Sequence, residues 1–182
     1  MNDFTTSLCA ASANVTITGS VSGSTSTGVW STSGTGIFSP NDTTLNATYV
    51  PSQSDIDSGS VIITLSATNA CLATDTSEAK INPAPQANAG DDQYLCVGTD
   101  TADLAGIITG VTTTGQWTTS GSGSFFPNDS TLNAKYVLSF DDSVAGGVTL
   151  VLATTNNAGC PAEDDTMSII LTTVPAVEAG DD

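Results

Sequence analysis

The stretch GVWSTSGTGIFSPNDTTLNATYV, residues 28–50, returns as GQWTTSGSGSFFPNDSTLNAKYV, residues 115–137. The two stretches lie 87 residues apart, and weaker similarity continues on both sides of them. The chain of 182 residues therefore holds two copies of one unit, each about 90 residues long. Arrays of repeated units usually span distance rather than catalyse, because each unit contacts only its neighbours.

The pattern of apolar residues is that of β-strands throughout. Val15 and Ile17 alternate with polar residues, residues 45–49 alternate in the same way, and residues 61–67 form the longest apolar run. Clusters of Gly, Ser, Asn and Pro separate these runs at the spacing of a β-sandwich. We predict an all-β chain of two tandem sandwich domains with about seven short strands each, and no window shows helical periodicity. The single tryptophan of each copy, Trp30 or Trp117, is predicted to fill the centre of its sandwich.

The repeat sets the expected domain boundaries. We assign residues 1–84 to the first repeat, residues 85–174 to the second, and residues 175–182 to the start of the next repeat or its linker. The assignment of the last segment rests on VEAGDD at 177–182, which restates ANAGDD at 87–92. Residues 82–87 form a short linker with two prolines, which favours an extended, semi-rigid spacer and domains arranged end to end.

The charge balance excludes several classes of partner. Nineteen Asp and Glu residues stand against two Lys or Arg, without histidine, for a net charge of −17. Nucleic acid is excluded as a partner because phosphate binding needs clustered basic residues. No apolar stretch reaches the length of a membrane helix, so no membrane insertion is expected, and residues 1–3 do not begin a signal peptide.

Four cysteines, two in each copy, predict that disulfide bonds stabilise the chain. They are Cys9, Cys71, Cys96 and Cys160. We expect one disulfide within each domain, Cys9–Cys71 and Cys96–Cys160, as the pairing that respects the repeat. Such bonds would stabilise each small unit by about 4 kcal/mol and would imply export to an oxidising compartment. The alternative is four reduced, buried cysteines in a cytosolic protein.

Acidic residues that recur between the copies suggest calcium as a cofactor. Asp91 and Asp92 lie at the expected domain junction, and Asp55 matches Asp142 in the other copy. Calcium binds six to eight oxygen ligands, mostly carboxylates and carbonyls, so these four residues are the candidate ligands. The alternative for Asp91 and Asp92 is an exposed turn whose side chains bond the backbone. Asp75 is likewise matched with Asp164 in the second copy.

Catalysis is not expected. Without histidine the chain has no Ser-His-Asp or Cys-His site, and paired cysteines would leave no thiolate nucleophile. We therefore interpret the chain as a protein without enzymatic activity.

The motifs AGDDQxxC, W(S/T)TSGxGxF, LNAxY and CxxxD resemble repeats of giant cell-surface proteins of Bacteroidota, such as the flavobacterial gliding-motility adhesins. The resemblance covers both copies. It implies an immunoglobulin-like sandwich, secretion, display on the outer surface, and a filament of many copies.

From these observations we expect a structural stalk or spacer segment of a large filamentous cell-surface adhesin. Its expected partners are neighbouring repeats of the same chain, with a surface polysaccharide or the substratum as a further candidate. The alternative function is an extracellular carbohydrate-binding module, which would need an exposed aromatic platform.

Overall fold

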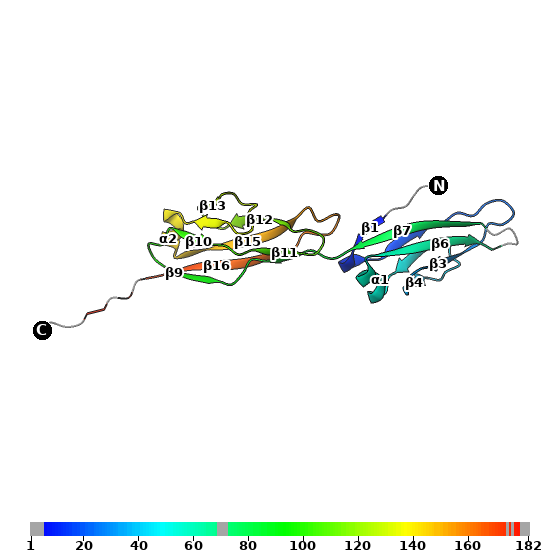
Figure 1. The fold of residues 1–182 in the computed structure, drawn as a ribbon, viewed down its shortest axis with the longest axis horizontal. Helices are drawn as coiled ribbons and strands as arrows, with labels where there is room; N and C mark the ends of the chain where they lie inside the picture. Colours follow the sequence, from blue (N-terminus) through cyan, green and yellow to red (C-terminus); the bar gives the residue numbers. More distant parts are fainter. Residues whose placement is uncertain (1–5, 69–72, 174, 176, 179–182) are drawn as a thin grey trace. The chain divides into compact units, whose positions relative to one another are not determined.

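A computed structural model describes residues 6–68, 73–173, 175 and 177–178 of the chain. The chain divides into two compact units (Figure 1). Unit 1 comprises Met1–Ala84 together with Ala158–Pro161, and unit 2 comprises Pro85–Asn157 and Ala162–Asp182. The short segment 158–161 belongs by sequence to the second repeat, so the compact units do not coincide fully with the sequence repeats.

Unit 1 is a sandwich of two sheets. Its four-stranded sheet has the order β1-β7-β6-β3, and its three-stranded sheet has the order β2-β5-β4. The strands are β1 (Thr6–Cys9), β2 (Val15–Thr18), β3 (Gly28–Thr32), β4 (Ile37–Ser39), β5 (Asn46–Val50), β6 (Ser60–Ala67) and β7 (Thr74–Asn82). The apolar run of residues 61–67 lies in β6, which is inside its sheet between β7 and β3.

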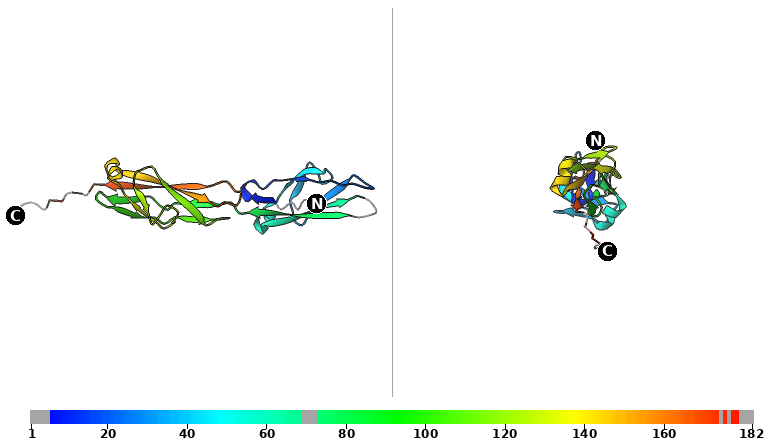
Figure 2. Two further views of the ribbon diagram at one scale, coloured as in Figure 1. Left: turned by 90° about the horizontal axis from the view of Figure 1, so that it is seen from above. Right: turned by 90° about the vertical axis from the view of Figure 1, so that its left-hand side faces the viewer.

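Unit 2 repeats this plan with one additional pair of strands. Its sheets have the orders β12-β15-β16-β9, β10-β14-β13 and β11-β8. The strands are β8 (Gln86–Asn88), β9 (Gln93–Cys96), β10 (Thr101–Asp103), β11 (Ile107–Thr109), β12 (Thr114–Thr119), β13 (Ser124–Phe126), β14 (Lys135–Val137), β15 (Gly147–Thr155) and β16 (Asp164–Thr172). Within each unit the strands form facing layers, which Figure 2 shows from two further directions.

The core of each unit lies between its layers. Alternate residues of the strands are buried, as in β2 with the pattern buried-exposed-buried-exposed. Trp117 and Tyr136 lie at the centre of the unit 2 core, and Trp30 and Tyr49 hold the equivalent places in unit 1. The prediction that both tryptophans are core residues is confirmed. Each indole Nε1 donates a hydrogen bond to a backbone oxygen, of Thr44 at 3.1 Å for Trp30 and of Leu132 at 3.2 Å for Trp117.

Strand register corrects one match that the sequence suggested. Leu65 pairs with Asp75 across β6 and β7, and Leu152 pairs with Asp165 across β15 and β16. Leu65 and Leu152 are 87 residues apart, so the structural counterpart of Asp75 is Asp165, 90 residues later, and not Asp164. The second copy thus contains three more residues before its last strand, because the loop between β15 and β16 is longer.

Two short helices were not predicted. Helix α1 (Gln53–Ser58) and helix α2 (Phe140–Ala145) precede β6 and β15, and a 3-10 turn, η1 (Ala10–Ser12), follows β1. Six residues are too few to show an amphipathic period. Each α-helix is instead held by its termini, with a serine N-cap and a C-terminal glycine in the left-handed conformation.

Candidate functional site

A disulfide bond joins Cys9 at the end of β1 to Cys160 in the loop between β15 and β16. The Cα atoms are 5.0 Å apart, and 151 positions of sequence separate the two cysteines. Both cysteines are buried and lie in unit 1, because the segment Ala158–Pro161 belongs to that unit. The bond therefore connects residues of the first and second sequence repeats.

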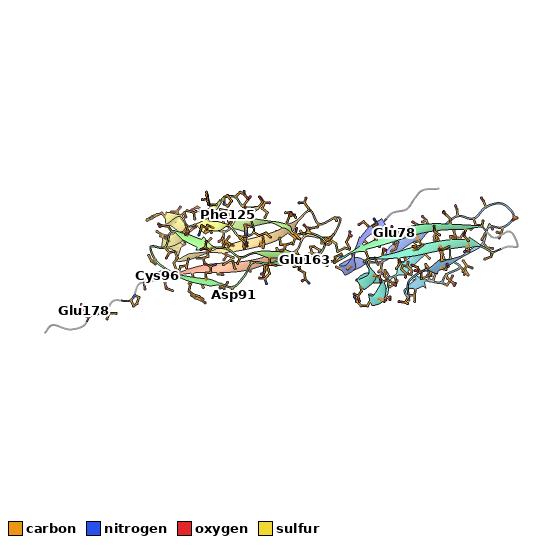
Figure 3. All side chains as sticks on the ribbon, viewed as in Figure 1. Glu78, Asp91, Cys96, Phe125, Glu163 and Glu178 are labelled. Atoms are coloured by element: carbon orange, nitrogen blue, oxygen red, sulfur yellow. A yellow bond between two sulfur atoms is a disulfide. The ribbon has the colours of Figure 1, made fainter. Side chains whose placement is uncertain are left out.

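This pairing corrects the predicted one. We expected Cys9–Cys71 and Cys96–Cys160, but Cys9 is bonded to Cys160, and Cys96 is exposed with a free thiol (Figure 3). Cys71 lies outside the described residues. The prediction considered only bonds within one copy, although a bond from the first cysteine of one copy to the second cysteine of the next also respects the repeat.

Local backbone geometry explains how Cys160 comes to lie in unit 1. Three residues in the longer loop of the second copy have positive φ: Asn156 at 55°, Ala158 at 48° and Gly159 at 89°. The loop is also held by Asn82, whose Nδ2 donates to the Ala158 oxygen at 3.4 Å and to Ser7 Oγ at 2.6 Å. Left-handed backbone is uncommon outside glycine, which indicates that this loop conformation is stabilised by its contacts.

A second feature is a buried carboxylate at the N-terminus of helix α1. The Asp55 side chain is only 2% exposed. Its Oδ1 accepts a hydrogen bond from the Thr35 N–H at 2.9 Å, and its Oδ2 accepts from the Gly36 N–H at 2.9 Å. The same Oδ2 accepts from the Tyr49 hydroxyl at 2.7 Å and from the Ser52 N–H at 3.0 Å. Asp55 thus ties the helix, the β3–β4 turn and strand β5 together.

The glycines of the repeated motif make room for this carboxylate. A Cβ atom added at Gly34 would meet Asp55 Oδ1, and one added at Gly36 would meet the Tyr49 hydroxyl. Ser52 completes a reciprocal capping box, in which its Oγ accepts from the Asp55 N–H at 3.2 Å. The Gly-x-Gly segment, the tyrosine and the Ser-x-x-Asp segment are therefore parts of one arrangement.

Unit 2 repeats the arrangement around Asp142, which is 3% exposed. Its Oδ1 accepts from the Ser122 N–H at 3.0 Å. Its Oδ2 accepts from the Tyr136 hydroxyl at 3.0 Å and from the Ser139 N–H at 2.9 Å. We call these two arrangements, centred on Asp55 and on Asp142, the aspartate–tyrosine clusters.

The clusters favour the ionised carboxylates and the neutral tyrosines. Burial by itself raises the pKa of Asp55, but hydrogen bonds from the Tyr49 hydroxyl and from backbone N–H groups outweigh it, so that the pKa lies below its ordinary value. Burial raises the pKa of Asp142 in the same way, and hydrogen bonds led by the Ser139 and Ser122 N–H groups bring it below the ordinary value. Burial, with the adjacent carboxylate, raises the pKa of Tyr49 and of Tyr136.

These clusters do not fit the calcium role predicted for Asp55 and Asp142. Both oxygens of each carboxylate already accept hydrogen bonds from protein donors, which leaves a cation few lone pairs.

Asp91 and Asp92 are exposed and lie between β8 and β9, where Asp92 Oδ1 accepts from the Ser168 N–H at 2.7 Å. Within the described residues, no group of three or more His, Cys, Asp or Glu could hold a metal ion.

Sequence reasoning missed the partners of the two buried aspartates. The available signal was Ser52-x-x-Asp55 and its copy Ser139-x-x-Asp142, which is the spacing of a capping box. The recurring aspartates were recognised, but their recurrence was assigned to metal binding because acidic residues are also the usual ligands of calcium.

In the part of the chain that the structure describes, no helix is long and apolar enough to cross a membrane.

Comparison with known proteins shows the fold. Immunoglobulin domains 1–5 of Sidekick-1 superpose with a TM-score of 0.50 at 14% identity, over 92% of this chain and 37% of that one. The immunoglobulin domains 1 and 2 of DIP-gamma give a TM-score of 0.42 at 12% identity, over 80% of this chain and 82% of that one. Mouse cadherin-23 EC22-24 gives a TM-score of 0.44 at 8% identity, over 96% of this chain and 64% of that one. No protein-family model and no curated protein matches the sequence. The chain thus consists of two tandem immunoglobulin-like β-sandwiches, as the sequence predicted.

Proposed function

We propose that this chain is a structural stalk segment, which carries tension, of a large, filamentous cell-surface adhesin of the gliding-motility type. The observation that carries the proposal is the Cys9–Cys160 disulfide. The repeated sandwich units and the sequence resemblance to surface adhesin repeats support it further.

The disulfide changes the path of a pulling force through the chain. Force applied to the residues before Cys9 and after Cys160 crosses the bond and does not pass along the chain between them. Strands β2 to β15 lie within this bypassed part, whereas β1 and β16 stay in the load path. A tether built in this way resists extension even when a bypassed strand opens, because the covalent link holds.

The same bond supports an extracellular location, because disulfides persist in oxidising compartments. The net charge of −17 favours a solvated surface that repels other acidic molecules. We propose neighbouring repeats as the partners of the chain. The proposal includes no catalysis, since the chain has no histidine and both buried carboxylates are engaged by protein donors.

The alternative, a carbohydrate-binding module, is less well supported. A stacking platform needs an exposed aromatic face, but Trp30 and Trp117 are both buried. Phe38 and Phe125 cover them from one side, with ring centroids 6.5 and 6.4 Å from the indoles.

Calcium at Asp91 and Asp92 stays a prediction. Calorimetric titration of calcium into chelator-stripped protein tests it, with Asp91→Asn/Asp92→Asn as the control. Heat released only by the unsubstituted chain would support the site, and the absence of heat together with an unchanged melting temperature would remove it.

Single-molecule force spectroscopy of the chain, held by its two ends, tests the proposed function. Reduction, or the substitution Cys160→Ser, frees the 151 positions between the bonded cysteines and should add about 50 nm of extension. The substitution Cys96→Ser is the matched control and should add none, since Cys96 carries a free thiol. Equal extensions of the oxidised and reduced chains would contradict a bond that carries the pulling force.

A further inference from the structure

Cys96 occupies in unit 2 the place that Cys9 occupies in unit 1. Each is the last residue of a short strand, Cys9 of β1 and Cys96 of β9. Each strand pairs in parallel with a longer one, which places Cys9 opposite Asn82 in β7 and Cys96 opposite Thr172 in β16. The two cysteines are 87 positions apart, which is the offset of the repeat. They are therefore equivalent in sequence and in structure.

The place in unit 1 shows what such a cysteine binds. Cys9 is bonded to Cys160, which lies in the loop between β15 and β16 of the second repeat. This loop packs in unit 1, since Ala158–Pro161 belongs to that unit and Cys9 is only 6% exposed. Asn82, opposite Cys9 in the sheet, also donates to the Ala158 oxygen. The end of strand β1 is therefore a binding place for a cysteine-bearing loop of the next repeat.

Cys96 presents the same reactive group without a partner among the described residues. Its thiol is exposed and free. Tyr94, two residues earlier, is 69% exposed, and Val97, the next residue, is 46% exposed. Cys160 of the same chain cannot serve as its partner, because the Cys160 sulfur is bonded to Cys9. A free thiol between exposed apolar side chains is the kind of surface that a partner segment covers.

We propose that Cys96 is the covalent docking point for a further repeat, and that it bonds the cysteine that corresponds to Cys160 in that repeat. The occupant is a loop of the β15–β16 type, held as the Cys160 loop is held at Cys9. This inference rests on the proposed function, because its partner is a neighbouring repeat of the filament. It extends that proposal from one bond to a series, in which the first cysteine of each repeat is bonded to the second cysteine of the next.

The bond forms by thiol–disulfide exchange. The loop cysteine enters as a mixed disulfide with a small thiol compound, made by reaction with the oxidised, disulfide form of that compound. The Cys96 thiol loses its proton to solvent, and the thiolate attacks the loop sulfur. The new S–S bond forms as the mixed disulfide breaks, and the small thiol leaves as a thiolate with the electron pair.

Successive bonds of this kind overlap along the chain. The Cys9–Cys160 bond encloses position 96, so a bond from Cys96 begins inside that interval and ends beyond it. Every backbone position between Cys9 and the far end of the second bond is then enclosed by at least one disulfide. A single backbone cut anywhere in this part leaves the two pieces covalently joined, which suits a filament under tension outside the cell.

The test adds a third repeat to the full chain. Residues 1–182 are followed directly by a second copy of residues 93–182, a join that keeps the spacing because VEAGDD at 177–182 restates ANAGDD at 87–92. In the added copy, Cys96→Ser removes the duplicate thiol and Ala162→Ser marks the loop by its mass. The protein is oxidised in a buffer of reduced and oxidised glutathione, alkylated, digested with a protease specific for acidic residues, and analysed by mass spectrometry.

We expect two linked pairs of peptides, Cys9 with the unmarked loop and Cys96 with the marked loop. Alkylation of Cys96 should fall at least tenfold from its level in the chain of 182 residues, where its thiol is free. Substituting Cys160→Ser in the original repeat should leave Cys96 bonded to the marked loop, because the two cysteines bind different loops.

The double substitution Cys96→Val/Val97→Cys in the original repeat is the matched control. It keeps an exposed thiol in the chain and moves it one residue beyond the end of β9. This thiol should stay alkylated, since the equivalent bond in unit 1 is made by the last residue of the strand.

The Cys9–Cys160 pair in the same molecule reports whether the chain has folded and oxidised. With that pair present, a fully alkylated Cys96, or Cys96 linked to the unmarked loop, would overturn this inference and leave the proposed function standing. Absence of the Cys9–Cys160 pair would contradict the proposed function and the inference with it. A thiol at position 97 that links to the marked loop as completely as Cys96 would show that proximity alone makes the bond, and would also overturn the docking point.

Discussion

The Tyr49 hydroxyl donates a 2.7 Å hydrogen bond to Asp55 Oδ2, and the Tyr136 hydroxyl donates to Asp142 Oδ2 in the other unit at 3.0 Å. Each bond joins a buried tyrosine of a strand, β5 or β14, to the N-terminal turn of a short helix. The two clusters therefore give matched sites for substitution within one molecule.

Asp55→Asn should destabilise unit 1 by about 3 kcal/mol, because the amide brings N–H groups against backbone N–H donors and removes charge-assisted hydrogen bonds. Asp142→Asn should have the same effect on unit 2. Thermal or urea unfolding measures both. The exposed neighbours in the same helices, Asp57 and Asp141, supply the control substitutions to Asn. Equal effects of the buried and exposed substitutions would argue against the clusters as stabilising elements.

Stability should depend on pH at both extremes. The folded pKa of Asp55 and of Asp142 lies below the unfolded value of about 3.9, so the stability they supply is present above that pH and is lost as the pH falls below it. The pKa of Tyr49 and of Tyr136 is raised, so their contribution is present below about pH 10 and is lost as the pH rises beyond it. Urea unfolding from pH 2 to 11 measures the dependence, and Asp55→Asn/Asp142→Asn should flatten its acid side. An acid side as steep in this variant as in the unsubstituted chain would contradict the assignment.

Gly34→Ala should destabilise unit 1, since the new methyl group would meet the Asp55 carboxylate and the Val61 side chain. We expect a loss of about 1–3 kcal/mol, the usual range for overpacking. The exposed Ser31 on the adjacent strand β3 offers a control, Ser31→Ala, that should change the unfolding free energy little. A Gly34→Ala chain as stable as the control would show that the Gly-x-Gly segment does not need its glycine there.

Cys160→Ser should lower the melting temperature of unit 1, because Cys9 and its partner loop both belong to that unit. On the chain-entropy model the bond is worth at most about 5 kcal/mol, and less when unit 2 stays folded inside the closed loop. Differential scanning calorimetry separates the transitions of the two units. Cys96→Ser should leave the melting temperatures of both units unchanged. If Cys96→Ser lowered a melting temperature as much as Cys160→Ser, Cys96 could not be the free thiol.

Local patterns in the sequence predicted the sandwich but not the contacts between distant segments. Alternation predicted β2 and β5, because burial on one face of a strand leaves a period of two in the sequence. The longest apolar run predicted β6, and the repeated tryptophan identified both cores. Residue spacing does not show which cysteines lie close together in the fold. The Cys9–Cys160 bond depends on the path of the loop between β15 and β16, which is known only from the structure. Asp55 and Asp142 were identified as special positions, but their burial, which decides between cap and metal ligand, depends on tertiary packing.

The central claim is that one disulfide links the two sequence repeats through Cys9 and Cys160. The most direct test alkylates free thiols in the native, unreduced protein, digests it with a protease specific for acidic residues, and identifies the disulfide-linked peptides by mass spectrometry. The account predicts a peptide pair that contains Cys9 and Cys160, with the alkyl label on the exposed Cys96. A pair that links Cys96 to Cys160, or Cys9 to Cys71, would contradict it and would return the staple to the interior of each repeat.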